Sequence, residues 1–140
     1  MDYVLANIRE MLIAQGYSQS IIITNQVIMQ TSNNSSLQNA IFLIEESSQP
    51  ILSNNSFLDF ALYLRNSDPQ TAETQILDIY HYLHGKRGNV GTVANNKVKI
   101  NLVQALSRPY VYSLNTTGAN LVEYVIKFRV QYIDTDFDNI

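Results

Sequence analysis

The sequence of 140 residues has no cysteine, no tryptophan and little charge. Without cysteine the chain has no disulfide framework, no thiolate zinc site and no cysteine nucleophile. Charged residues make up 15% of the chain and the formal net charge is -3, which argues against a duplex-DNA binder with a strongly basic face. The sequence also lacks a secretory signal and any apolar run long enough to span a membrane. We therefore expect a protein that is made and folded in a cytoplasm.

In place of charge the sequence carries uncharged polar residues, namely 15 Asn, 12 Ser and 10 Gln. Hydrophobic residues still make up 46% of the chain, which argues against intrinsic disorder. The length suits a single domain over residues 1–140 and is too short for two ordinary domains. Because a surface poor in charge repels its neighbours weakly, we expect other subunits to cover much of it.

Two segments have the spacing of amphipathic helices. Residues 2–15 place apolar side chains on one helical face, and Gly16 stands where a glycine commonly ends a helix. Residues 69–84 repeat this pattern after Asp68, a good N-cap, and Gly85 follows as a stop. The sequence therefore predicts two helices, each with one face to bury.

Alternating or continuous apolar residues predict strands in the rest of the chain. Residues 121–132 alternate most regularly, which is typical of a half-buried antiparallel strand. The segment 85–96, with three Gly and three Asn, predicts a flexible loop, and residues 134–140 predict a flexible acidic tail. Other predicted extended segments are 20–29 (one segment or a short strand pair), 40–46, 57–65, 98–102 and 110–114. The element order predicts an α+β fold: a mostly antiparallel β-sheet with two amphipathic helices packed on one face.

Candidate catalytic and metal-binding groups are few. Asp78, His81 and His84 recur every third residue on the second predicted helix, so two of them could approach one ion, but a zinc site needs further ligands. The carboxylate pairs Glu45–Glu46 and Asp134/Asp136 have no evident base beside them. We expect no enzymatic activity, no bound metal and no cofactor.

The segment Gly85-Lys86-Arg87-Gly88 has the GxxG spacing of a nucleic-acid-binding loop. In that module the loop joins two helices, whereas here the following residues do not start a helix. A small nucleic-acid-binding module remains an alternative, and it would use four basic residues: Lys86, Arg87, Lys97 and Lys99.

Several short sequences in the chain are similar to those of one protein family. The opening helix ends in Gln15-Gly16, and the second helix ends in the sequence Ile-Tyr-His-Tyr-Leu-His-Gly over residues 79–85. Arg108-Pro109-Tyr110 and a last strand ending in Phe128-Arg129-Val130 follow. With these features the chain resembles the tail terminator family of long-tailed bacteriophages, specifically the small "minor capsid proteins" of phages of Gram-positive hosts.

The resemblance implies a structural subunit that assembles with itself into a ring, usually a hexamer. Such a ring caps the head-proximal end of the tail tube, stops tail polymerisation and offers a docking surface to the neck or head-completion protein. It implies a location in the virion at the tail–neck junction, no membrane partner, and DNA only as it passes through the ring lumen. A head-completion or neck adaptor protein is the alternative within the same assembly.

A ring contact joins two different surfaces, which strand edges and apolar-tipped tails can supply. On this basis we expect assembly contacts from the predicted loop and tail, at Lys86, Arg87, Asn89, Phe137 and Ile140.

Overall fold

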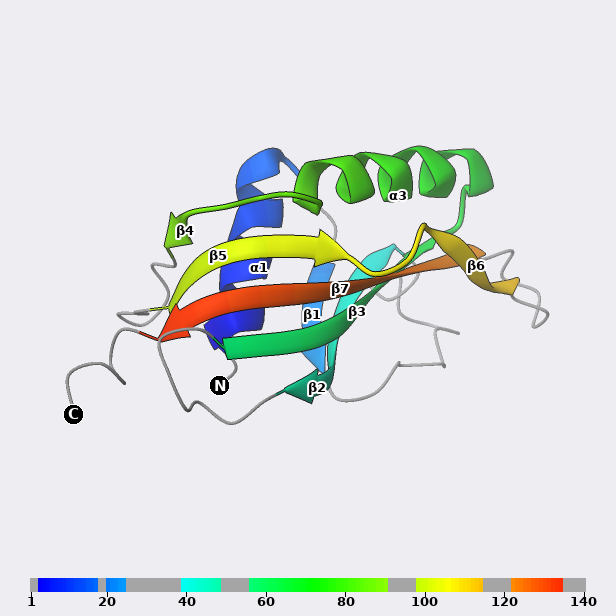
Figure 1. The fold of residues 1–140 in the computed structure, drawn as a ribbon. Helices are drawn as coiled ribbons and strands as arrows, with labels where there is room; N and C mark the ends of the chain where they lie inside the picture. Colours follow the sequence, from blue (N-terminus) through cyan, green and yellow to red (C-terminus); the bar gives the residue numbers. More distant parts are fainter. Residues whose placement is uncertain are drawn as a thin grey trace.

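The computed structural model describes residues 3–17, 20–24, 39–48, 56–90, 98–114 and 122–134. Its elements are drawn in Figure 1. In chain order they are α1 (Tyr3–Gln15), β1 (Ser20–Thr24), β2 (Ala40–Ser48), β3 (Ser56–Asn66), α3 (Pro69–Leu83), β4 (Asn89–Val90), β5 (Val98–Ala105), β6 (Tyr110–Leu114) and β7 (Val122–Asp134).

Within the described residues, seven strands form one sheet in the order β1-β2-β3-β7-β5-β4, and β6 also pairs with β7. One edge of β7 pairs with β3 from Val122 to Tyr132. Its other edge is shared, because β6 pairs with residues 122–125 and β5 with residues 128–134. Every pairing is antiparallel except that of β1 with β2, which is parallel. The predicted mostly antiparallel sheet is confirmed, although no sequence pattern indicated the parallel β1.

Both helices pack on the same face of this sheet, as predicted (Figure 1). In β3 and β7, the side chains that point to the helices are the even-numbered ones that the alternation had placed on one face. Phe60 and Phe128 stack there with ring centroids 5.3 Å apart. The α+β prediction with two helices on one face is therefore confirmed.

Neither described helix is long and apolar enough to cross a membrane.

The predicted start of α3 is confirmed, and the helix ends one residue earlier than predicted, at Leu83 with His84 as its cap. The Asp68 carboxylate accepts the backbone N–H of Gln70 at 3.3 Å, and Pro69 occupies the first helical turn, where its missing N–H costs nothing. After Leu83 the chain turns at Gly85, whose φ of +88° is a conformation that glycine adopts without strain.

The predicted flexible loop after α3 is wrong for its first part. Residues 85–90 run along the outer edge of β5 and include the short strand β4. The N–H of Gly85 donates to the carbonyl of Val103 at 2.7 Å, and the N–H of Val103 donates to the carbonyl of Lys86 at 2.9 Å. The cause is backbone pairing with a strand far away in sequence, which local composition does not reveal. The rest of that loop lies outside the described residues.

The predicted acidic tail begins later than expected. β7 continues through Ile133 and Asp134, which pair with Lys99 and Val98 of β5. The expectation that the strand stops at Tyr132 is therefore wrong by two residues, because β5 is long enough to pair with them. Residues 135–140 lie outside the described residues.

The sheet face opposite the helices is also buried at one end. Arg65 of β3 stands directly opposite Glu123 of β7, and their side chains are only 1% and 7% exposed. The Arg65 Nη2 and Glu123 Oε1 atoms are 3.0 Å apart, and the Arg65 guanidinium carbon lies 5.0 Å from the centre of the Phe42 ring. The prediction of a half-buried final strand is therefore wrong at Glu123, where an opposite charge makes burial tolerable.

We predict that replacing Arg65→Ala lowers the free energy of unfolding by about 3–5 kcal/mol, because Glu123 is left buried without its cation. The double variant Arg65→Met, Glu123→Leu should recover most of this loss, since no buried charge remains. Urea denaturation measures both. Arg129→Ala, which breaks the exposed pair with Asp59, is the matched control and should change stability little. Equal losses from Arg65→Ala and Arg129→Ala would contradict the buried pair's role.

Candidate functional site

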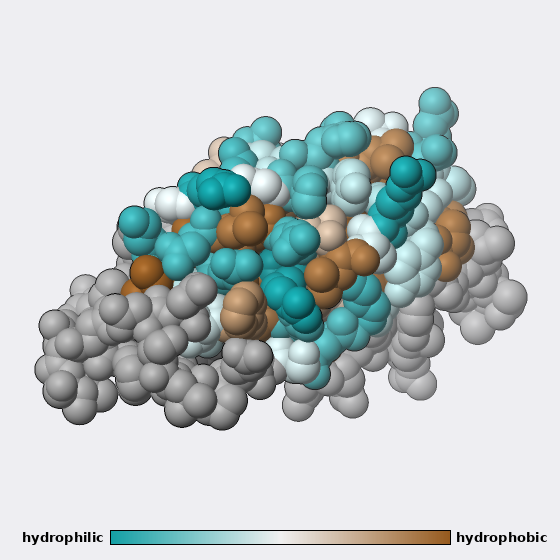
Figure 2. Space-filling view, viewed as in Figure 1, coloured by the Kyte–Doolittle hydropathy of each residue, from teal (hydrophilic) through white to brown (hydrophobic). Residues whose placement is uncertain are grey.

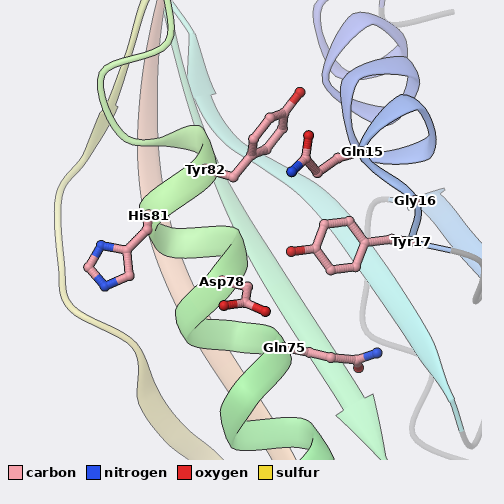
Figure 3. Close-up of a pocket in the computed structure, with 7 residues that line it drawn as sticks. All are labelled: Gln15, Gly16, Tyr17, Gln75, Asp78, His81 and Tyr82. Atoms are coloured by element: carbon pink, nitrogen blue, oxygen red, sulfur yellow. The ribbon is translucent and has the colours of Figure 1, made fainter.

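An open cleft of about 710 Å³ lies between the C-terminal end of α1 and the side of α3 (Figure 3). Seven residues line it: Gln15, Gly16, Tyr17, Gln75, Asp78, His81 and Tyr82. In Figure 3 the side chains of Tyr17 and Asp78 point toward one another across the cleft, whereas His81 points away from the other labelled residues.

Local sequence explains how the cleft forms. On α3, Gln75, Asp78 and Tyr82 are three and four residues apart, so they share the helical face that borders α1. At the end of α1, Gly16 has a φ of +107° and turns the chain so that Tyr17 faces α3. The Tyr82 hydroxyl donates to the carbonyl of Met11 at 3.2 Å, which ties α3 to α1 at the cleft.

The electrostatics of the cleft favour a cation. Asp78 supplies its carboxylate, and within the described chain no lysine or arginine forms an ion pair with it. The pKa of Tyr17 is raised above 10.0, first by burial and then by the negative charge of Asp78 and the neighbouring Tyr82. Burial also raises the pKa of Tyr82, whose ring has the Lys86 ammonium 4.4 Å from its centre.

The three residues considered as metal ligands do not converge on one point. The His84 Nδ1 atom accepts the backbone N–H of Ala105 in β5 at 3.0 Å, while Asp78 lines the cleft on the other side of α3. His81 points away from Asp78 in Figure 3. In the described ranges no group of three His, Cys, Asp or Glu side chains is placed to hold a metal ion.

The structure describes three of the five residues predicted as assembly contacts. Lys86 and Arg87 lie in the segment that covers the edge of β5, and the side chain of Arg87 is exposed. Asn89 belongs to β4 and pairs with Ile100. The other two, Phe137 and Ile140, lie outside the described residues, so the assembly contacts remain a prediction.

Other polar residues considered from the sequence are scattered over the molecule. Glu46 forms an ion pair with Lys127 on the sheet, and Lys99 is exposed on β5. Lys97 and Asp136 lie outside the described residues. Of the paired carboxylates, Glu46 is thus bound to a lysine, and the pair Asp134/Asp136 remains outside what the described side chains test.

Sequence reasoning did not identify the exposed apolar side chains at the bend between β5 and β6. Leu106, Tyr110 and Val111 are 46%, 45% and 50% exposed. The N–H of Leu106 donates to the carbonyl of Lys127 at 2.7 Å, and the N–H of Lys127 donates to Ser107 Oγ at 3.1 Å, which fixes the bend to β7. Elsewhere on the face drawn in Figure 2, hydrophobic side chains form small separate areas among hydrophilic ones.

No protein-family model and no curated protein matches the chain. Among solved structures it is similar to a chain of the "Virion of native gene transfer agent (GTA) particle", with 10% sequence identity and a TM-score of 0.47. The similarity covers 93% of this chain and 91% of that chain. A likeness at this level carries no argument about what the chain does.

We predict that Asp78→Asn lowers the pKa of Tyr17 while leaving it above 10.0, because burial remains the larger cause of the shift. Titration of carbon-13-labelled tyrosine by NMR measures this pKa, and Tyr17→Phe assigns the signal. Glu73→Gln, an exposed charge removal on the same helix, is the control and should leave the pKa of Tyr17 unchanged. An unchanged Tyr17 pKa in Asp78→Asn would show that the two side chains do not interact across the cleft.

Proposed function

We propose that this chain is a structural subunit of a bacteriophage virion that assembles into a ring, a hexamer if it follows the family it resembles. The ring caps the head-proximal end of the tail tube, stops tail polymerisation and provides the docking surface for the neck protein. The role involves no catalytic step and no cofactor. The proposal rests on the sequence resemblance and on one structural observation, the unequal coverage of the sheet edge formed by β5 and β6.

The chain covers the β5 part of this edge with its own residues. The carbonyl of Ile100 accepts the N–H of Gly88 at 2.7 Å, the backbone of Val103 bonds to Gly85 and Lys86, and the N–H of Ala105 is bound by His84. Strand edges covered in this way cannot pair with another chain.

The β6 part has no such cover among the described residues, where β7 is its one partner strand. It also exposes Tyr110 and Val111. An unpaired edge with exposed apolar side chains is suited to pairing with a strand of another subunit.

The opposite edge of the sheet offers a second, different surface. Within the described chain, β2 is the one strand that pairs with β1, and residues 21–23 of β1 are half-buried isoleucines. A ring of identical subunits needs two unlike surfaces that fit each other, because each subunit contacts its neighbours head to tail. The two ends of this sheet are unlike surfaces, which supports the proposal.

We predict that the purified chain forms a ring, alone or on adding tail tube protein, and that Val111→Lys weakens ring formation while leaving the fold intact. A charge at the β6 edge opposes strand pairing between subunits. Size-exclusion chromatography with light scattering and negative-stain images measure assembly. Leu77→Lys, at a residue 42% exposed on α3 that does not line the cleft, is the matched control and should assemble normally.

A chain that stays monomeric with tail tube protein and retards single-stranded DNA would replace this proposal with the nucleic-acid-binding module, in which the exposed Arg87 and Lys99 would contact phosphates. Tails that are purified before they join heads distinguish a tail terminator from a neck adaptor. A terminator is present on them, whereas a neck adaptor is absent.

We also predict that removing residues 135–140 weakens ring assembly more than folding, because β7 ends at Asp134 and its pairing with β5 is complete without them. Thermal unfolding and light scattering measure the two effects on the same sample. A truncated chain that unfolds would contradict the prediction, and so would one that assembles as well as the full chain.

A further inference from the structure

The cleft between α1 and α3 has the chemistry of a guanidinium-binding site. It combines the Asp78 carboxylate with the aromatic side chains of Tyr17 and Tyr82. It also adjoins the C-terminal end of α1, which carries partial negative charge and has no basic residue in its last turn. A planar guanidinium can bond a carboxylate through two N–H groups and stack on a tyrosine ring.

Three acidic residues of the sheet are matched with a basic side chain: Glu46 with Lys127, Asp59 with Arg129 and Glu123 with Arg65. Glu45, exposed on β2, forms no ion pair with a described residue and does not line the cleft. Asp78 is exposed and also has no counterion within the described chain, and it lines a cleft beside two partly buried tyrosines. The chain thus leaves one carboxylate in a concave site open to a cation from outside.

A complementary group stands on the bend between β5 and β6. Arg108 is exposed and forms no ion pair with any described residue. It lies between the exposed Leu106 and Tyr110, on a bend that two hydrogen bonds fix to β7. An arginine surrounded by apolar side chains on a fixed support is the kind of residue that dominates binding energy at protein interfaces.

We propose that the cleft of one copy of this chain binds the Arg108 side chain of the next copy. The inference rests on the proposed ring and specifies one of its contacts. The guanidinium bonds to Asp78 and stacks on Tyr17, while Leu106, Tyr110 and Val111 exclude water around the pair.

Within one copy, the bend and the cleft lie on different sides of α3. In Figure 1, α1 lies at one end of α3, whereas β6 lies at the far end of the molecule. The bend between β5 and β6 starts just after Ala105, whose N–H bonds to His84 at the end of α3, whereas Asp78 lines the cleft on the side of α3 that borders α1. The bend of one copy in the cleft of another joins two different surfaces, which is the head-to-tail kind of contact that closes a ring.

Among the described residues, Arg87 and Lys99 are also exposed and form no ion pair, and the Lys86 ammonium already lies 4.4 Å from the centre of the Tyr82 ring. Arg87 is followed by Gly88 in the segment that covers β5, and Lys99 lies within β5. Neither has the cluster of exposed large apolar side chains that surrounds Arg108. The observations therefore favour Arg108, and charge exchange can identify the partner directly.

The test uses charge reversal and mixing of the full-length chain. Arg108→Glu and Asp78→Arg should each raise the protein concentration needed for half-assembly about thirty-fold or more. An equimolar mixture of the two variants should assemble again, because each cleft then meets a bend of opposite charge. Lys99→Glu and Glu73→Lys are the matched controls, and each should assemble as the unchanged protein does. Light scattering and negative-stain images measure assembly, and circular dichroism verifies folding.

The outcomes separate this inference from the proposed function. If the unchanged chain forms no ring with tail tube protein, the proposed function fails. If it forms rings and both single variants also do, the ring stands and the Arg108 contact is wrong. Rescue of Asp78→Arg by Arg87→Glu instead of Arg108→Glu would likewise overturn the assignment.

Should charge reversal unfold the chain, the neutral variants Asp78→Asn and Arg108→Gln decide the question. Each should weaken assembly alone, and the double variant should be no weaker than either single one, because both remove the same contact. Additive losses in the double variant would show that the two side chains act separately.

Discussion

The pairing of both edges of β7 is the constraint on which the rest of the structure depends. β3 occupies one edge over almost the whole strand, while β6 and β5 divide the other. Because side chains alternate along a strand, this register sends Ile126, Phe128 and Val130 to the helices and Lys127 and Arg129 to the opposite face. A shift of one residue would exchange the two sets and place charges beneath α3.

The buried pair Arg65–Glu123 gives the same register a second basis. The two residues stand opposite each other only when β3 and β7 are paired as observed. Any slip would leave a guanidinium and a carboxylate buried without their counterions, which costs more than a lost apolar contact. On the other face the stacking of Phe60 on Phe128 depends on the same alignment. An ionic and an aromatic contact thus specify one pairing from both sides of the sheet.

Local signals predicted the elements well, and long-range contacts explain what those signals missed. Asp68 and Gly85 fix the limits of α3 through neighbouring backbone groups, so the sequence contains what is needed. The burial of Glu123 depends on Arg65, 58 residues away, and the coverage of β5 depends on its pairing with residues 85–90. The cleft was missed for the same reason. Tyr17 and Asp78 meet only after α1 and α3 have packed on the sheet.

The bare edge at β6 follows from the way the chain leaves β5. Between β5 and β6 the chain bends at residues 106–109, and Pro109 has no N–H to offer a neighbouring strand. The covering segment ends where His84 binds the N–H of Ala105, immediately before that bend. To cover β6 as well, the segment that pairs with β5 would have to follow the bend. It does not, and the edge of β6 therefore has no partner strand from the described chain. The same bend brings Arg108 and its apolar neighbours to the surface, which joins the open edge and the exposed guanidinium in one surface.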